Sequence, residues 1–108
     1  MALTLSDRKK ARVEEIRAGF ARLREELAGY DRTHGGRFLI YGSAATGRFH
    51  YESDIDIIVD FKGPPLRSAL DFVESAGARL RLKADIPPIS WCTRAFLERI
   101  SAGAIVLP

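Results

Sequence analysis

The sequence has few of the features that mark secreted, membrane or metal-cluster proteins. It contains one cysteine, Cys92, in 108 residues, which excludes an internal disulfide and a metal site built from cysteines. Its apolar runs are too short to cross a bilayer, and its first ten residues lack the apolar stretch of a signal peptide. No repeat or Pro/Gly/Ser-rich linker divides the chain. We therefore expect one domain over residues 1–108, in the cytoplasm and away from membranes.

The chain also lacks a strong excess of either charge. Seventeen Lys and Arg residues stand against 14 Asp and Glu residues, for a net charge of +3. The basic residues near the start of the chain are followed by glutamates, a pattern typical of a solvated helix face. We therefore do not expect nucleic-acid binding from the charge.

The first expected element is an amphipathic helix over residues 5–28. Thr4 followed by Asp7 fits a capping box, and Gly29 is placed to end the helix. This gives an N-terminal helical segment over residues 1–29, followed by a loop and then the sheet over residues 37–108. The apolar stripe is expected to pack on the domain's own sheet, although a partner helix could use it too. The stripe consists of Val13, Ile16, Phe20, Leu23 and Leu27.

The rest of the chain alternates between strand and helix patterns. We expect a helical turn at residues 43–47, a helix from Pro65 to about Gly77, and a short helix capped by Thr93. This order predicts an α/β domain with a small mixed sheet flanked by helices. The expected strands cover residues 37–41, 55–61, 79–86 and 104–107.

Several single residues are expected to be structural. We expect Trp91 and Phe96 to lie in the core beneath the last helix. Cys92 is expected to be an inert buried thiol. His34 and His50 have no partner at metal-ligand spacing and are expected in loops.

Two carboxylates stand out on the second expected strand. Asp54 and Asp56 are two residues apart, so both side chains leave the same face. Paired carboxylates suit Mg²⁺, which is bound by one or two of them together with substrate phosphates. The alternative is solvent-facing charge on an edge strand.

A glycine–serine turn precedes these carboxylates. Gly42 lets a phosphate approach the backbone closely, and Ser43 begins a helical turn that presents a hydroxyl and N–H groups. Ser43 could instead serve only as a helix cap. Arg48 is either a phosphate contact or a surface charge. The glycine spacing from Gly42 to Gly47 also fits half of a P-loop, but the Lys-Ser/Thr pair of that motif does not follow.

A third carboxylate would complete a site for a nucleoside triphosphate with magnesium. Asp85, near the end of the third expected strand, could bind a second metal ion or act as general base. Its alternatives are an ion pair with Lys83 or Arg81, or a turn role before Pro87.

The spacing of these residues resembles a known family. Gly42-Ser43, ten further residues and then Asp54-Ile55-Asp56 is similar to the G-S-x₁₀-D-x-D signature of minimal nucleotidyltransferases, in the polymerase-β-like superfamily. The segment 83–86 resembles that family's third-acid strand, and 96–107 resembles its closing helix and strand.

The resemblance implies a polymerase-β-like fold that uses ATP and two Mg²⁺ ions to transfer a nucleoside monophosphate to an acceptor hydroxyl. Small bacterial members are antitoxins of HEPN-domain ribonucleases, and some adenylylate a tyrosine of that toxin. Carried over, Gly42 and Ser43 would hold the triphosphate, Asp54 and Asp56 would bind the metals, and Asp85 would be the third acid.

One departure from the family pattern bears on activity. Many members carry arginine at the positions of Ala44 or Thr46, and here Arg48 would supply the positive charge from another place. The alternative function is a catalytically weak or inactive module of the same fold that neutralises or scaffolds a partner protein. Either reading implies an interface, in a homo- or hetero-oligomer.

Overall fold

The computed structural model describes residues 4–107, which form a four-stranded mixed sheet with helices packed against it. The strand order is β3-β2-β1-β4. Strand β1 runs antiparallel to both β2 and β4, and β2 runs parallel to β3. This confirms the predicted α/β class and the small mixed sheet. The strands are β1 (Arg37–Tyr41), β2 (Asp54–Asp60), β3 (Lys83–Asp85) and β4 (Ile105–Leu107).

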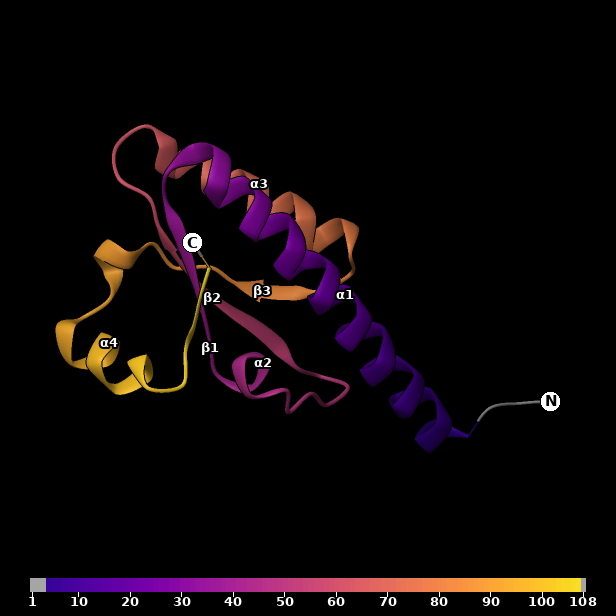
Figure 1. Cartoon of the computed structure of the whole chain (residues 1–108). Helices are drawn as coiled ribbons and strands as arrows, with labels where there is room; N and C mark the ends of the chain where they lie inside the picture. Colours follow the sequence, from indigo (N-terminus) through magenta and orange to yellow (C-terminus); the bar gives the residue numbers. More distant parts are fainter. Residues whose placement is uncertain (1–3, 108) are drawn as a thin grey trace.

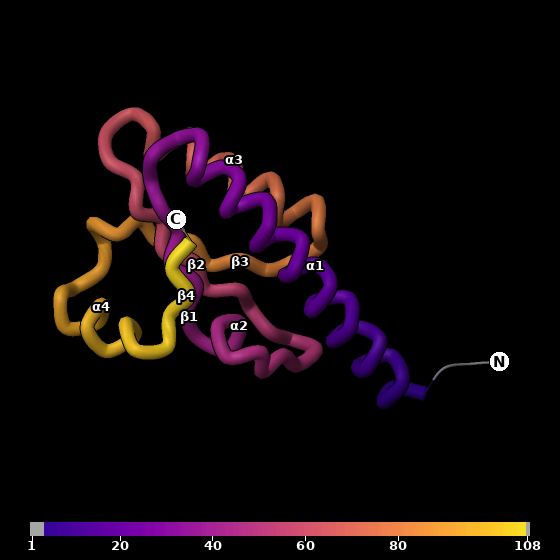
Figure 2. The backbone as a smooth tube through the Cα atoms, in the orientation of Figure 1, coloured from indigo at the N-terminus to yellow at the C-terminus, as the bar shows by residue number. Residues whose placement is uncertain are grey.

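Two helices, α1 (Leu5–His34) and α3 (Pro65–Arg79), lie side by side on one face of the sheet (Figures 1 and 2). The apolar stripe of α1 is buried from Ile16 onward, as the periodicity predicts. It packs with the alternate strand residues that face the same way, and this layer is the core. The strand residues in it include Phe38, Ile40, Ile55, Ile57 and Val59.

The start of α1 is as predicted, but its end is not. Thr4 and Asp7 form the expected capping box. Gly29 does not stop the helix, which continues to His34 and ends at Gly35 in the left-handed conformation (φ 75°). The predicted loop over residues 30–36 is therefore wrong. Tertiary packing explains the extra turn, because the Tyr30 ring stacks on the Phe72 ring of α3 at 4.3 Å between centroids.

The third strand is shorter than the alternation predicts. Helix α3 runs through Gly77 to Arg79, and only Lys83–Asp85 pairs with β2. The N–H of Leu82 donates to the carbonyl of Gly77 at 2.8 Å, and Arg81 has φ 59°. Helix termination, rather than sheet pairing, therefore sets the backbone up to Leu82.

The segment after β3 leaves the sheet and returns as its last strand. It contains the 3-10 helix η1 (Ile89–Trp91) and helix α4 (Arg94–Ser101). The predicted cap of α4 is present, since the N–H of Phe96 donates to the Thr93 hydroxyl at 3.1 Å. The predicted burial of Trp91 is wrong: the side chain lies in the short η1 turn and is 79% exposed. Phe96 is half-buried, with its ring edge-on to Tyr41 at 5.5 Å.

Within residues 4–107, no helix combines the length and the apolar content that a membrane-spanning segment needs.

Candidate active site

The candidate site lies on the face of the sheet opposite α1 and α3. On that face Tyr41, Asp56 and Asp85 are register partners across β1, β2 and β3. Adjacent strands lie about 4.8 Å apart, so the three side chains form one row. Asp54 leaves β2 on the same face, beside Lys83 of β3. The structure thus brings the three carboxylates predicted from the sequence to one end of one face, which we name the acidic row (Asp54, Asp56 and Asp85).

The acidic row is not neutralised by neighbouring cations. Within residues 4–107, none of its three carboxylates forms an ion pair or accepts a hydrogen bond. Lys83 makes no ion pair with Asp85, and Arg81 instead reaches Glu15 of α1 at 3.9 Å. The structure therefore does not support the alternative in which Asp85 is paired with Lys83 or Arg81.

The electrostatics of the row follow from this arrangement. Burial raises the pKa of Asp56, and the negative charges of Asp85 and Asp54 raise it further. The pKa of the neighbouring Tyr41 hydroxyl is also raised, first by burial and then by Asp56 and Asp85. A divalent cation would relieve this repulsion, whereas a lone proton relieves part of it.

Gly42 joins the acidic row to the serine turn. It has φ 71° and ψ −151°, and a Cβ built on it would lie 2.6 Å from the Oδ2 atom of Asp56. No other residue type fits that space without displacing the carboxylate. The backbone at Gly42 therefore lies against Asp56, as expected if the serine turn and the carboxylates belong to one site.

The serine turn itself is short and is held by packing against the core. Helix α2 (Ser43–Thr46) packs its buried Ala44 into the core, while the Thr46 hydroxyl donates to the Ser43 carbonyl at 3.1 Å. The Ser43 hydroxyl makes no hydrogen bond within the described part of the chain, so Ser43 is not seen to act as a cap.

A second serine, which sequence reasoning missed, fixes the connector before the acidic strand. Ser53 is buried and its hydroxyl accepts from the backbone N–H of His50 at 2.7 Å, while its own N–H donates to the His50 carbonyl at 3.0 Å. His50 is a loop residue, as predicted, whereas His34 is the last residue of α1 rather than part of a loop. Its position between a polar connector and Asp54 could have indicated this role from the sequence.

A cavity of about 450 Å³ opens beside the serine turn. Arg48 lies on its wall, as a phosphate contact would require. Arg99 of α4 lies on the same wall, and nothing in the local sequence pattern singles it out. The lining includes Gly42, Ser43, Thr46, Arg48, Arg99 and Ile100.

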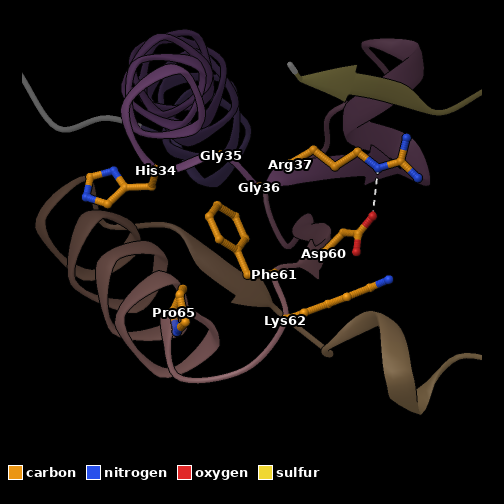
Figure 3. A pocket seen from close by; sticks show the side chains of 8 residues that line it. All are labelled: His34, Gly35, Gly36, Arg37, Asp60, Phe61, Lys62 and Pro65. Carbon is orange, nitrogen blue, oxygen red and sulfur yellow. Dashed lines mark hydrogen bonds and ion pairs between the residues drawn. The ribbon is translucent and has the colours of Figure 1, made fainter.

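Another cavity, of about 510 Å³, lies at the opposite end of β1 (Figure 3). It contains Asp60, which shares the face of the acidic row but accepts from the Arg37 Nε atom at 2.7 Å. Asp60 is therefore an ion-paired acid at the end of β2 and does not belong to the candidate site.

The donor set suits magnesium that arrives with a nucleotide. Within residues 4–107, no three His, Cys, Asp or Glu side chains are gathered tightly enough to enclose a metal ion by themselves. Mg²⁺ normally uses one or two carboxylates and takes its remaining ligands from phosphates and water. Unpaired carboxylate oxygens next to an open glycine turn fit that mode. Cys92, which was predicted to be buried, is only partly buried; burial raises the pKa of its thiol, and its Sγ atom lies 3.8 Å from the Pro88 carbonyl oxygen.

Comparison with known families agrees with the geometry. The family described as nucleotidyltransferase domain matches residues 20–100, from the middle of α1 to the end of α4. The chain belongs to this family. The match covers strands β1 to β3, the serine turn and the acidic row of the nucleotidyltransferase domain. No curated protein is a significant match to the chain. The predicted superfamily is thereby confirmed, while the minimal subfamily and its HEPN pairing stay predictions.

Proposed function

We propose that this nucleotidyltransferase domain transfers AMP from ATP, with magnesium, to a hydroxyl group of a partner protein. The observation that carries the proposal is the contact between the serine turn and the acidic row at Gly42 and Asp56. A phosphate held at Ser43 would lie directly beside carboxylates for which the described residues supply no counter-ion. Few other ligands than a metal–polyphosphate complex suit both halves of such a site.

Each site residue then has a definite role. Asp54 and Asp56 would hold the metal that accompanies the triphosphate, and Asp56 with Asp85 would hold a second. Bound magnesium would neutralise phosphate charge and lower the pKa of the attacking hydroxyl. The Ser43 hydroxyl would donate to a phosphate oxygen. Asp85 would take the proton as the acceptor oxygen bonds to the α-phosphorus and pyrophosphate leaves.

A protein acceptor is supported by the surface around this face. Trp91 in η1 is 79% exposed, and Val106 in β4 is 51% exposed. Val106 pairs with Leu39, so it lies on the same face as the acidic row. Exposed tryptophan is typical of protein contact sites. The resemblance to minimal nucleotidyltransferases makes a HEPN-domain toxin the partner that we propose.

The test is transfer of label from ATP to a HEPN-domain partner protein that is co-expressed with this chain. With Mg²⁺ and α-labelled ATP, the partner should gain the label and the mass of one AMP. The variant with both Asp54→Asn and Asp56→Asn should leave it unlabelled. Asp71→Asn, an exposed acid in α3 that pairs with Arg67, serves as the matched control. Equal labelling by the double variant would overturn the proposal.

One observation favours a second function, in which the domain binds and neutralises its partner without chemistry. The α2 turn contains no Lys or Arg. Its Ala44 is buried, and the Thr46 hydroxyl donates to the Ser43 carbonyl. In that case the double aspartate variant would still bind and silence the partner. Loss of silencing with binding intact would instead support the transferase.

A further inference from the structure

We infer that Arg99 of α4, together with Arg48, binds the polyphosphate chain of the nucleotide and sets the preference for a triphosphate. This inference rests on the proposed function, because it concerns the same site. It assigns a role to a residue that lies more than fifty positions from the serine turn and that no sequence signal marks.

Charge is the first argument. Within residues 4–107, neither arginine forms an ion pair with a carboxylate, although Arg94 on the same helix pairs with Glu98 at 3.2 Å. Among the described residues, no acidic side chain lines the cavity that the two arginines share with Ser43. A concave surface with two unpaired guanidinium groups and a free hydroxyl calls for an anion.

Position is the second argument. The Arg99 guanidinium lies over the Phe96 ring at 5.4 Å, and that ring meets Tyr41 edge-on at 5.5 Å. Tyr41 directly precedes Gly42. The aromatic pair thereby ties α4 to the end of β1 and holds the Arg99 side chain near the serine turn. The backbone of Arg48 is fixed to the serine turn, because its backbone N–H donates to the Ser43 carbonyl at 3.0 Å.

Gly42 therefore adjoins groups of opposite charge. Asp56 of the acidic row lies against it, and Gly42 itself also lines the cavity that contains Arg48 and Arg99. A metal-bound polyphosphate satisfies both at once, with its metal toward the acids and its free phosphate oxygens toward the arginines. A nucleoside monophosphate has only one phosphate group to divide between the metal and the arginines, so we expect it to gain less from Arg99.

The test compares ligands of different phosphate length by calorimetry on the full chain in Mg²⁺ buffer. The ligands are ATP, AMP and inorganic tripolyphosphate, and the variants are Arg99→Gln, Arg99→Lys and, as matched control on α4, Arg94→Gln. We expect Arg99→Gln to lower the affinity for ATP and for tripolyphosphate by about tenfold or more, which is the effect of losing a charged hydrogen bond. AMP affinity should change much less, and Arg94→Gln should bind as the wild type does.

Arg99→Lys separates charge from shape, since lysine keeps the charge but loses the two-pronged contact. It should bind ATP with intermediate affinity. Thermal unfolding of each variant checks that the fold is intact. The assignment of Arg99 is wrong if the wild type binds ATP and Arg99→Gln binds it equally well. It is also wrong if Arg99→Gln lowers the affinity for AMP by the same factor as the affinity for ATP. If the wild type binds neither ATP nor tripolyphosphate, the proposed function itself fails.

Discussion

Asp31, in the last turns of α1, is expected to make the stability of this domain depend on pH. Its side chain is 2% exposed, and neither carboxylate oxygen has a hydrogen-bond partner within residues 4–107. Burial raises its pKa from 3.8 to about 7 and outweighs the backbone N–H of Phe38, which acts in the opposite direction. At pH values between these two pKa values, Asp31 therefore carries a proton in the folded protein and has lost it in the unfolded chain.

The sign of the effect follows from proton linkage. Between the unfolded pKa of 3.8 and the folded pKa of about 7, the folded state binds more protons than the unfolded state. The free energy of unfolding therefore falls as pH rises through this window. At about 1.4 kcal/mol for each pKa unit, the loss between pH 4.5 and pH 8 is about 3 kcal/mol.

The assay is urea unfolding at several pH values for the wild type and for Asp31→Asn, which has a similar shape and no titration. Near pH 4.5 the two should be close in stability, because Asp31 is protonated there. At pH 8 Asp31→Asn should be the more stable by up to about 3 kcal/mol. Asp71→Asn removes an exposed carboxylate in α3 and controls for the change in net charge.

The decisive quantity is the difference between variant and wild type across the pH range, since other groups titrate equally in both. If that difference stays constant from pH 4.5 to pH 8, Asp31 is ionised in the folded protein. The reasoning from its burial would then be refuted, whatever the absolute stabilities are.

Three further changes are expected to separate the roles assigned above. Gly42→Ala should lower stability by about 1–2 kcal/mol and abolish ATP binding, because its φ of 71° disfavours a side chain and its Cβ would meet Asp56; unchanged ATP calorimetry would contradict this. Asp56→Asn should stabilise the ligand-free protein by a few tenths of a kcal/mol, by removing like-charge repulsion across the strands, and yet stop transfer; a loss of stability measured in urea would argue against repulsion. Trp91→Ala should change stability by less than about 0.5 kcal/mol, and Phe96→Ala should cost about 1–2 kcal/mol. Equal losses in thermal melts would mean that Trp91 is packed after all.

Local patterns predicted the elements whose residues decide their own conformation. The Thr4 and Thr93 caps, strand β1 and the α2 turn all lie where the sequence puts them. The errors occur where a distant contact overrides a local signal. Gly29 fails to end α1 because Tyr30 stacks on α3, and Gly77 does not end α3, which runs on to Arg79.

The candidate site divides in the same way. Alternation along β2 predicted that Asp54 and Asp56 share a face, and the parallel pairing of β2 with β3 then places Asp85 beside Asp56. Arg99 could not be predicted, because its approach to the serine turn depends on how α4 packs on Tyr41 through Phe96. Periodicity within a helix carries no information about that crossing.

The acidic row shows why stability alone does not account for this sheet. Like charges placed opposite one another on adjacent strands destabilise a fold, and Asp56 and Asp85 are register partners. Lys83 is close at hand but forms no ion pair with either, so the repulsion stays uncompensated within the described residues. A sequence optimised for folding would place an apolar or oppositely charged residue at one of these positions. In the function that we propose, a bound cation would offset this repulsion, and the absence of a side chain at Gly42 leaves the Asp56 carboxylate in place beside the serine turn. Under the proposed function, the same repulsion would couple metal binding to nucleotide binding, because the metal would offset the carboxylates and the phosphates would complete the coordination of the metal.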